Sequence, residues 1–185
     1  MRSPQSSAHL ARTERVDQRN HDCGSVSSKI GVCGDSAGGH LAASAAHDVP
    51  GVSFQVLVYP VFDLRCNTAS YKLYSDGYSL TEKQMHWYAN HFLNNEEEKS
   101  DPRASPLLRQ SFSHLPPALC IVTGSDVLVD ENMEYVQKLK DAGVETELVV
   151  MKGVVHSYFV LPAFFRENIA FSYAKVADFI KKHST

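Results

Sequence analysis

Residues 28–44, SKIGVCGDSAGGHLAAS, join a short apolar segment to an alanine-rich segment through a glycine-rich turn. SKIGVC favours a β-strand and HLAASAAH favours a helix. Between them, GDSAG at residues 34–38 matches the G-x-S-x-G pattern, which presents a serine at the tip of a sharp strand-to-helix turn. Chance alone would produce such a match in roughly one chain in twenty of this length. The match is therefore informative because it follows a predicted strand and opens a predicted helix.

Strands and helices continue to alternate along the rest of the chain. FQVLVY at residues 54–59 is an unbroken apolar run that ends at a proline, as expected of a strand buried on both faces. ALCIVTG at 118–124 and VETELVVM at 144–151 predict two more strands, and helices are expected over about 131–143 and 167–182. The pattern predicts an α/β fold, with a mostly parallel sheet and helices on both faces.

The chain is long enough for one domain with a hydrophobic core. Residues 1–27 are polar and charged without periodicity, so we expect a poorly ordered N-terminal segment followed by one partial domain over 28–185. Residues 63–115 predict an irregular and helical excursion from the sheet. Within it, Thr81 and Gln84 stand in capping-box positions at the start of a helix. We expect this excursion to cover a site.

Composition argues against several kinds of partner. The 18 Lys and Arg residues are scattered among 21 Asp and Glu residues, which argues against a nucleic-acid-binding patch. The sequence contains no run approaching the ~18 apolar residues of a spanning helix, so we expect no membrane segment in this chain. The cysteines lack the close paired spacing of a zinc site, and we expect buried free thiols in a reducing, cytoplasmic compartment rather than a metal site. The cysteines are Cys23, Cys33, Cys66 and Cys120.

A serine hydroxyl becomes a nucleophile only beside a base, and two later residues stand where an acid and a base are needed. Asp126 follows the predicted strand at 118–124, and His156 follows the strand at 144–151. The carboxyl ends of parallel strands meet at one edge of the sheet, so we expect both residues near Ser36. The order Ser, Asp, His is also the order that accompanies this kind of turn. The eight other histidines lie in the N-terminal segment, in helices or in the excursion, where packing or surface roles are expected.

Two other aspartates near these positions have alternative interpretations. Asp130 is the rival acid, although together with Glu131 it also suits a cap on the following helix. Asp35 precedes the serine, and we expect it to make a structural hydrogen bond at the turn because adjacent residues there do not point the same way.

The turn itself also predicts an oxyanion donor. Ala37 starts the helix, so its backbone N–H is expected to face the oxyanion that forms during ester cleavage. A side chain at either flanking glycine, Gly34 or Gly38, is expected to collide with the neighbouring backbone.

Five segments carry a more specific resemblance: GDSAGGHLAAS at 34–44, YPVFDL at 59–64, ASPLL at 104–108, GSDVLVDE at 124–131 and VVHSYF at 154–159. Together they resemble the hormone-sensitive-lipase-like esterases of the α/β-hydrolase fold, the group that includes arylacetamide deacetylase. The resemblance covers nearly all of the chain from Lys29 onward.

The resemblance implies an activity and a role for each site residue. It implies a serine carboxylesterase that hydrolyses small esters with short to medium acyl chains, with no metal or organic cofactor. Ser36 would be the nucleophile, Asp126 the orienting acid and His156 the base. The nucleophile elbow would comprise Gly34, Asp35, Gly38 and Gly39 around that serine.

The chain departs from the family pattern at two points. Val127 follows the acid where proline is common in the family, a change that we expect to be tolerated. The sequence also contains no HGGG segment, whose backbone N–H groups complete the oxyanion hole in the family. Loss of one such donor costs about 10²- to 10³-fold in turnover. We therefore expect a truncated isoform or an incomplete gene model, with the N-terminal strands of the sheet missing.

This departure leaves alternatives open. Without a neighbouring strand, the predicted strand at residues 28–33 becomes an exposed edge prone to pair with another chain. The alternative to an active esterase is a non-catalytic, truncated hydrolase-like protein that acts as a small-molecule binding or interaction module. An amidase or deacetylase with the same three residues is a further alternative that the sequence does not separate from an esterase.

Overall fold

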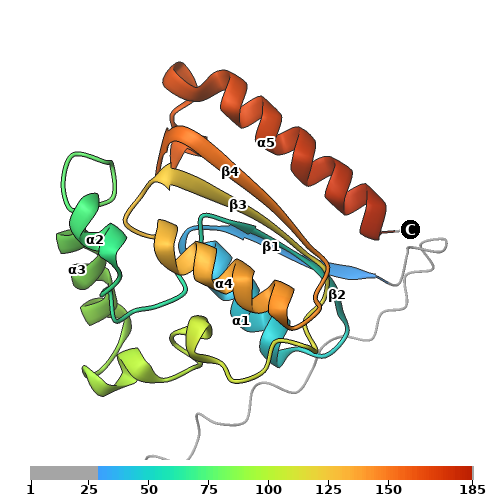
Figure 1. The fold of residues 1–185 in the computed structure, drawn as a ribbon, viewed down its shortest axis with the longest axis horizontal. Helices are drawn as coiled ribbons and strands as arrows, with labels where there is room; N and C mark the ends of the chain where they lie inside the picture. Colours follow the sequence, from blue (N-terminus) through green and yellow to red (C-terminus); the bar gives the residue numbers. More distant parts are fainter. Residues whose placement is uncertain (1–28, 185) are drawn as a thin grey trace, which may run out of the picture.

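The computed structural model describes residues 29–184, so the expectation of a poorly ordered segment over 1–27 lies outside the described residues. Within the described part, four parallel strands form one sheet in the order β1-β2-β3-β4 (Figure 1). The strands are β1 (Ile30–Asp35), β2 (Val52–Val58), β3 (Ala118–Ser125) and β4 (Thr146–Val155). The predicted α/β fold with a parallel sheet is confirmed.

Helices cover both faces of this sheet. They are α1 (Ala37–Asp48), α2 (Ala69–Leu73), α3 (Glu82–Phe92), α4 (Val129–Asp141) and α5 (Pro162–His183), with short 3-10 helices η1 (Glu97–Ser100), η2 (Pro106–Leu108) and η3 (Tyr158–Val160). Helices α1 and α4 pack on one face, and α5 packs on the other (Figure 1). The two central strands, β2 and β3, therefore bury side chains on both sides, which explains their unbroken apolar runs.

The two cores divide along the faces of the sheet. Leu57 and Cys120 point into the core shared with α1 and α4, which also contains Tyr135. Phe54 and Ile121 point to the opposite face, against α5. This alternation follows from the two-residue period of a strand.

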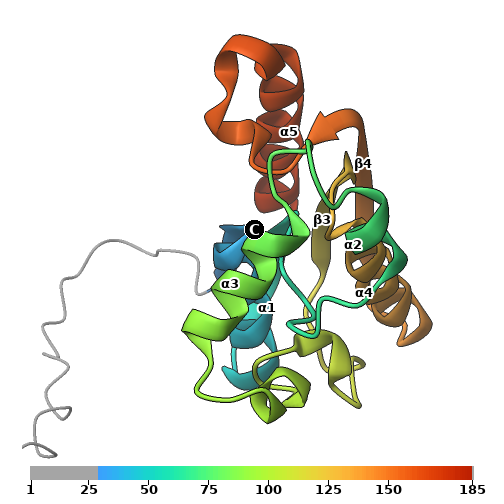
Figure 2. The same ribbon diagram turned by 90° about the vertical axis from the view of Figure 1, so that its left-hand side faces the viewer.

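The excursion between β2 and β3 forms a third core at the carboxyl ends of the strands. Its helices α2 and α3 lie across this end of the sheet (Figures 1 and 2). The predicted capping box is present: the Thr81 hydroxyl accepts from the Gln84 N–H at 3.2 Å, and the Gln84 side chain accepts from the Thr81 N–H at 2.9 Å. Met85 and Ala89 of α3 are buried against Val127, just beyond β3. The excursion therefore packs on the rim where Ser36 and Asp126 were expected.

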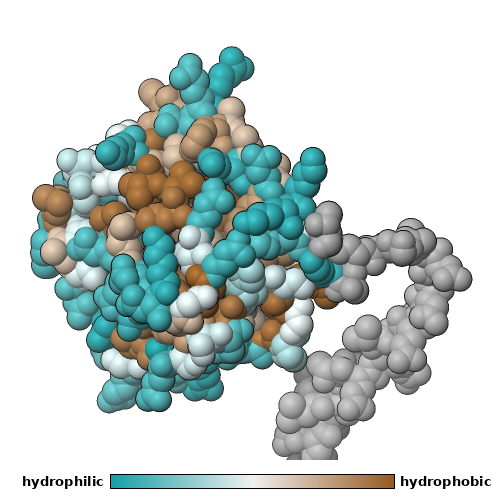
Figure 3. All heavy atoms as spheres, turned by 45° about the vertical axis from the view of Figure 1, so that its right-hand side comes forward, coloured by the Kyte–Doolittle hydropathy of each residue, from teal (hydrophilic) through white to brown (hydrophobic). Residues whose placement is uncertain are grey.

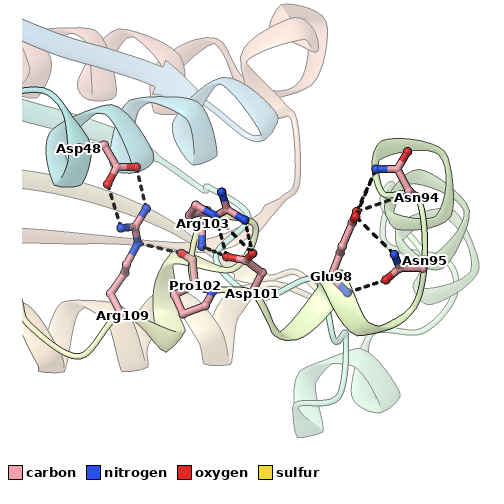
Figure 4. A network of polar contacts seen from close by, with 8 residues as sticks. All are labelled: Asp48, Asn94, Asn95, Glu98, Asp101, Pro102, Arg103 and Arg109. Atoms are coloured by element: carbon pink, nitrogen blue, oxygen red, sulfur yellow. Dashed lines mark hydrogen bonds and ion pairs between the residues drawn. The ribbon is translucent and has the colours of Figure 1, made fainter.

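The returning part of the excursion is tied to the C-terminal end of α1. Arg109 donates two hydrogen bonds to the Asp48 carboxylate, at 2.8 and 2.7 Å, and a third to the Pro102 carbonyl at 2.8 Å (Figure 4). Earlier in the same loop, Glu98 accepts hydrogen bonds from the backbone and side chain of Asn94. A bidentate arginine–carboxylate pair fixes direction as well as distance, so the loop is held in one orientation against α1.

Apolar side chains also reach the surface at both edges of the sheet. Ile30 on β1 is 67% exposed, and Val150 on β4 is 40% exposed. Figure 3 shows one face on which hydrophobic residues gather in a patch among hydrophilic ones. Cys33, expected to be buried, is exposed because β1 lies at the edge of the described sheet, whereas Cys66 and Cys120 are buried free thiols.

Candidate functional site

The site begins at the turn between β1 and α1. Ser36 has φ 51° and ψ −119°, a backbone conformation that residues with side chains seldom adopt. It stands at the N-cap of α1, where a serine side chain commonly accepts from the helix, yet here the side chain makes no capping bond. The backbone N–H of Ser36 instead donates to the Val58 carbonyl at 2.9 Å, which fixes the turn to the end of β2. The hydroxyl is therefore left for another partner.

The glycines around Ser36 differ in whether a side chain would fit at their positions. A Cβ atom at Gly34 would lie 2.2 Å from the carbonyl of Gly38, and one at Gly39 would lie 2.7 Å from Cβ of Pro60. A Cβ atom at Gly38, however, would meet nothing within 4 Å. The expected collision at Gly38 is thus wrong, because that position opens outward on the first turn of α1. Of the three glycines, Gly34 and Gly39 are therefore the two that leave no room for a Cβ atom.

Gly34→Ala and Gly38→Ala are expected to change stability in opposite directions. Gly34→Ala forces backbone to move and should lower the free energy of unfolding by about 3 kcal/mol. Gly38→Ala replaces an unconstrained helical glycine and should raise it by about 0.5–1 kcal/mol. Urea unfolding followed by circular dichroism measures both changes. Equal destabilisation by the two substitutions would contradict this account of the turn.

Three predicted side chains meet at the carboxyl end of the sheet. The Ser36 Oγ atom lies 2.8 Å from Nε2 of His156, and Nδ1 of His156 lies 2.7 Å from Oδ2 of Asp126. Asp126 and His156 are almost wholly buried, at 1% and 3% exposure. His156 directly follows β4, which runs to Val155 rather than ending at residue 151 as the sequence had predicted.

The Asp126 carboxylate is held by more than the histidine. The Leu128 N–H donates to Oδ1 at 3.1 Å, and the Thr123 hydroxyl donates to Oδ2. Since a carboxylate only accepts, Nδ1 of His156 must supply the proton of the bond between them. Nε2 of His156 then carries the lone pair that accepts the Ser36 hydroxyl. This arrangement can remove a proton from the serine as it attacks a carbonyl carbon.

The rival aspartates occupy structural positions. Asp130 lies in the first turn of α4, where its Oδ2 atom accepts from the Ser70 N–H at 2.7 Å. Asp35 accepts a hydrogen bond from the Tyr59 hydroxyl at 3.3 Å, which is the structural hydrogen bond expected at the turn. Neither carboxylate is bonded to His156.

Comparison with known proteins places the chain in a family. A family model described as "alpha/beta hydrolase fold" matches residues 6–160. The chain belongs to this α/β-hydrolase family. An ethyl acetate hydrolase from Pseudomonas putida is 34% identical over 136 residues, which are 70% of this chain and 43% of that protein. The carboxylic ester hydrolase LipN from Mycobacterium tuberculosis is 34% identical over 161 residues, which are 82% of this chain and 43% of that protein.

Solved structures give the same result for this α/β hydrolase. An esterase from the hyperthermophilic archaeon Pyrobaculum calidifontis is 34% identical, with a TM-score of 0.78 over 84% of this chain and 53% of that one. A thermostable esterase from Pseudomonas putida is 33% identical, with a TM-score of 0.76 over 83% of this chain and 50% of that one. This chain thus spans less than half the length of the two curated relatives and about half the length of the two solved ones.

A pocket of about 500 Å³ opens beside Ser36 in this α/β hydrolase, within the size range of small-molecule sites. Its lining is mostly apolar and comes from α1, from the excursion including α3, and from the residues that follow β4. The lining residues are Ser36, Ala37, His40, Leu41, Val61, Leu64, Leu80, Met85, Tyr88, Ala89, His91, Phe92, His156 and Ser157. No Lys, Arg, Asp or Glu is among the described residues that line it, so the pocket suits an uncharged group.

The backbone N–H of Ala37 is the expected oxyanion donor of the hydrolase. Ala37 is the first residue of α1 and lines the pocket next to Ser36. The N–H groups of a first helical turn have no acceptor within their own helix. Such a donor, close to the nucleophile, can stabilise negative charge on a substrate oxygen.

Three residues near the hydrolase site were missed by sequence reasoning. In the sequence, Thr123 shows only as a polar residue within an apolar strand. Tyr59 shows only as an aromatic residue before a proline. Glu131 was considered as a helix cap, but it is fully buried, and its Oε1 atom accepts from the N–H groups of Phe62 and Asp63 at 2.6 and 3.2 Å. Burial raises the pKa of Glu131 well above that of an exposed glutamate.

Residues 29–184 show neither a metal-binding cluster nor a membrane-spanning helix. Among them, no cluster of three or more His, Cys, Asp or Glu side chains is placed to hold a metal ion. In the same residues, no helix is both long and apolar enough to cross a membrane.

Proposed function

We propose that this α/β hydrolase is a serine carboxylesterase that cleaves short- to medium-chain carboxylic esters through an acyl-enzyme on Ser36. The observation that carries the proposal is the continuous hydrogen-bonded chain from Ser36 through His156 to Asp126 at the mouth of an apolar pocket. The esterase names of relatives that are 34% identical support the reaction class.

The proposed reaction has two halves. Ser36 Oγ attacks the ester carbonyl carbon while Nε2 of His156 takes its proton, and the N–H of Ala37 stabilises the carbonyl oxygen as it becomes negative. The His156 imidazolium, paired with Asp126, then returns the proton to the departing alcohol, which leaves an acyl group on Ser36. Water, deprotonated by His156, releases the acid and restores the serine.

Ser36→Ala tests this proposal directly. The wild-type chain is expected to hydrolyse p-nitrophenyl acetate and butyrate and to react covalently with a fluorophosphonate probe. Ser36→Ala should lose both reactions because the attacking oxygen is gone. Ser157→Ala is a matched control, since Ser157 lines the same pocket but is not the proposed nucleophile. Equal rates for wild type and Ser36→Ala, or no labelling of wild type, would favour a non-catalytic binding module.

We also propose that copies of the chain associate through β1. In the described sheet β1 pairs on one side only, with β2, and its Ile30 is exposed. An apolar edge strand is a template for pairing with another chain. Sedimentation should show dimers that Ile30→Lys dissociates, and a wild-type chain that stays monomeric at all concentrations would contradict this proposal.

We further propose that residues 28–185 form one partial α/β-hydrolase domain and that it works in the cytoplasm. Elements on both sides of the excursion contribute strands to one sheet, which supports a single domain.

The cytoplasmic location is supported by the free thiols of Cys33, Cys66 and Cys120, which suit a reducing compartment. Localisation of a fluorescent fusion in the secretory pathway would contradict the cytoplasmic proposal.

A further inference from the structure

Tyr59 has a strained backbone conformation directly beside the proposed catalytic residues. It follows β2 and precedes Pro60, and its φ is 36°. A positive φ at a bulky residue that is not glycine is a true outlier, and such strain persists only where the surrounding structure imposes it. Tyr59 is also 1% exposed, so its side chain is committed to the interior.

The turn that follows β2, which contains Tyr59 and Pro60, is held tightly against the nucleophile elbow. The Tyr59 N–H donates to the Ile121 carbonyl of β3 at 2.7 Å. Two residues on, the Val61 N–H donates to the Ser36 carbonyl at 3.4 Å. Between them, Pro60 packs so closely on Gly39 that no Cβ atom would fit there. The turn after β2 and the elbow after β1 therefore form one packed unit.

The Tyr59 side chain connects this unit to the histidine. Its ring centroid lies 4.9 Å from that of His156, with an angle of 62° between the ring planes. Its hydroxyl donates to Oδ2 of Asp35, the residue before the nucleophile, at 3.3 Å. The ring also packs edge-on against Tyr158 and Phe159, at 5.6 and 5.7 Å between centroids. One side chain thus touches both the histidine and the elbow.

We infer that Tyr59 is a positioning residue whose ring holds the His156 imidazole in line with Ser36 Oγ, an inference that rests on the proposed esterase function. Apart from its bond to Ser36, the His156 imidazole is held by a single hydrogen bond, from Nδ1 to Asp126, and that bond alone leaves the ring free to pivot. The Tyr59 ring blocks this pivot on one side. The bond to Asp35 fixes the ring relative to the elbow, so that Nε2 and Oγ keep their 2.8 Å separation.

The chemistry of the phenol suits this role. Burial, together with the nearby Asp35 carboxylate, raises the pKa of Tyr59 far above its ordinary value. The hydroxyl therefore stays protonated and remains a donor to Asp35 at every pH at which an esterase would be assayed. Tyr59 does not exchange protons in the reaction, and its effect is exerted through the position of His156.

Replacement of the ring should lower the rate without weakening substrate binding. Tyr59→Leu is expected to reduce kcat for p-nitrophenyl butyrate by about 10²-fold, the usual effect of a displacement of about 1 Å, with KM changed less than about threefold. Tyr59→Met is a second ringless variant with a flexible side chain that fills irregular space, in case the leucine variant does not fold. Tyr59→Phe keeps the ring and should restore kcat to within about fivefold of wild type.

Tyr135→Leu is the matched control, because Tyr135 is equally buried but packs on the other face of the sheet, in the core shared with α1 and α4. It should lower the unfolding temperature and leave kcat unchanged well below that temperature. A folded ringless variant with wild-type kcat, or one with raised KM alone, would overturn the inference. Equal losses in Tyr59→Phe and Tyr59→Leu would also overturn it. Absence of Ser36-dependent turnover in wild type would instead overturn the proposed function, and the inference with it.

Discussion

Asp126→Asn is expected to lower kcat for ester hydrolysis by about 10⁴-fold while KM changes little. The asparagine amide can be turned so that its NH₂ group faces Nδ1 of His156, and that nitrogen must then accept rather than donate. The remaining ring proton moves to Nε2, where it points at Ser36 Oγ. A protonated Nε2 cannot take the proton of the serine, so the substrate binds but the attack fails. Steady-state kinetics with p-nitrophenyl butyrate measure the loss.

Asp130→Asn is the matched control for this substitution. Asp130 lies four residues further along and is bonded to the backbone of Ser70 rather than to His156. Its replacement should leave kcat within about threefold of wild type, because the amide oxygen still accepts from Ser70. If Asp130→Asn caused the large loss and Asp126→Asn a small one, the acid would have been assigned to the wrong residue.

Glu131→Ala is expected to lower the free energy of unfolding by about 3 kcal/mol. The substitution removes the acceptor of two buried N–H groups, those of Phe62 and Asp63, and leaves both without a partner. It also deprives the Tyr71 hydroxyl of its partner at 3.3 Å. Each buried donor left unpaired costs about 1–3 kcal/mol. Urea unfolding of wild type and variant measures the difference.

Glu131→Gln separates the hydrogen bonds from the charge. The amide oxygen can accept from the same two N–H groups, so the loss should stay below about 1 kcal/mol.

The raised pKa of Glu131 also predicts how stability changes with pH. Its folded form holds a proton that the unfolded form has lost, so wild-type stability falls as pH rises above about 4.5. Glu131→Gln cannot ionise, so its stability relative to wild type should increase as pH rises above about 4.5. An opposite trend would mean that the buried carboxylate is charged.

The alternating elements were predictable because each strand and helix carries its own local signal. The elbow was found from residues 34–38, and the excursion helix from Thr81 and Gln84. Boundaries were harder to predict. Helix α5 begins at Pro162, well before residue 167, because proline suits the first position of a helix even where the apolar pattern is weak. Helix α3 buries only Met85 and Ala89, whereas Tyr88 and Phe92 of the same helix are exposed and line the pocket.

Those site residues whose positions follow from the order of strands along the chain could be predicted. Those whose roles depend on how separate loops pack together could not. Ser36, Asp126 and His156 could be found because the carboxyl ends of parallel strands share one edge of a sheet. Thr123 and Tyr59 could not be found, because their roles depend on contacts between separate loops, whose side chains leave no periodic pattern. The outward opening at Gly38 was likewise invisible, since the space beside a turn depends on what packs against it.

Strands β2 and β3 lie side by side in direct register, from Gln55 opposite Ala118 to Val58 opposite Ile121, although the excursion separates them in the chain. The polypeptide therefore leaves the sheet and returns to it at adjacent points. The Arg109–Asp48 pair holds the returning loop against α1, a helix that lies outside the excursion. Evolution can lengthen, shorten or rewrite residues 63–115 without rerouting any strand. A pocket of different shape can thus arise above an unaltered Ser36, His156 and Asp126.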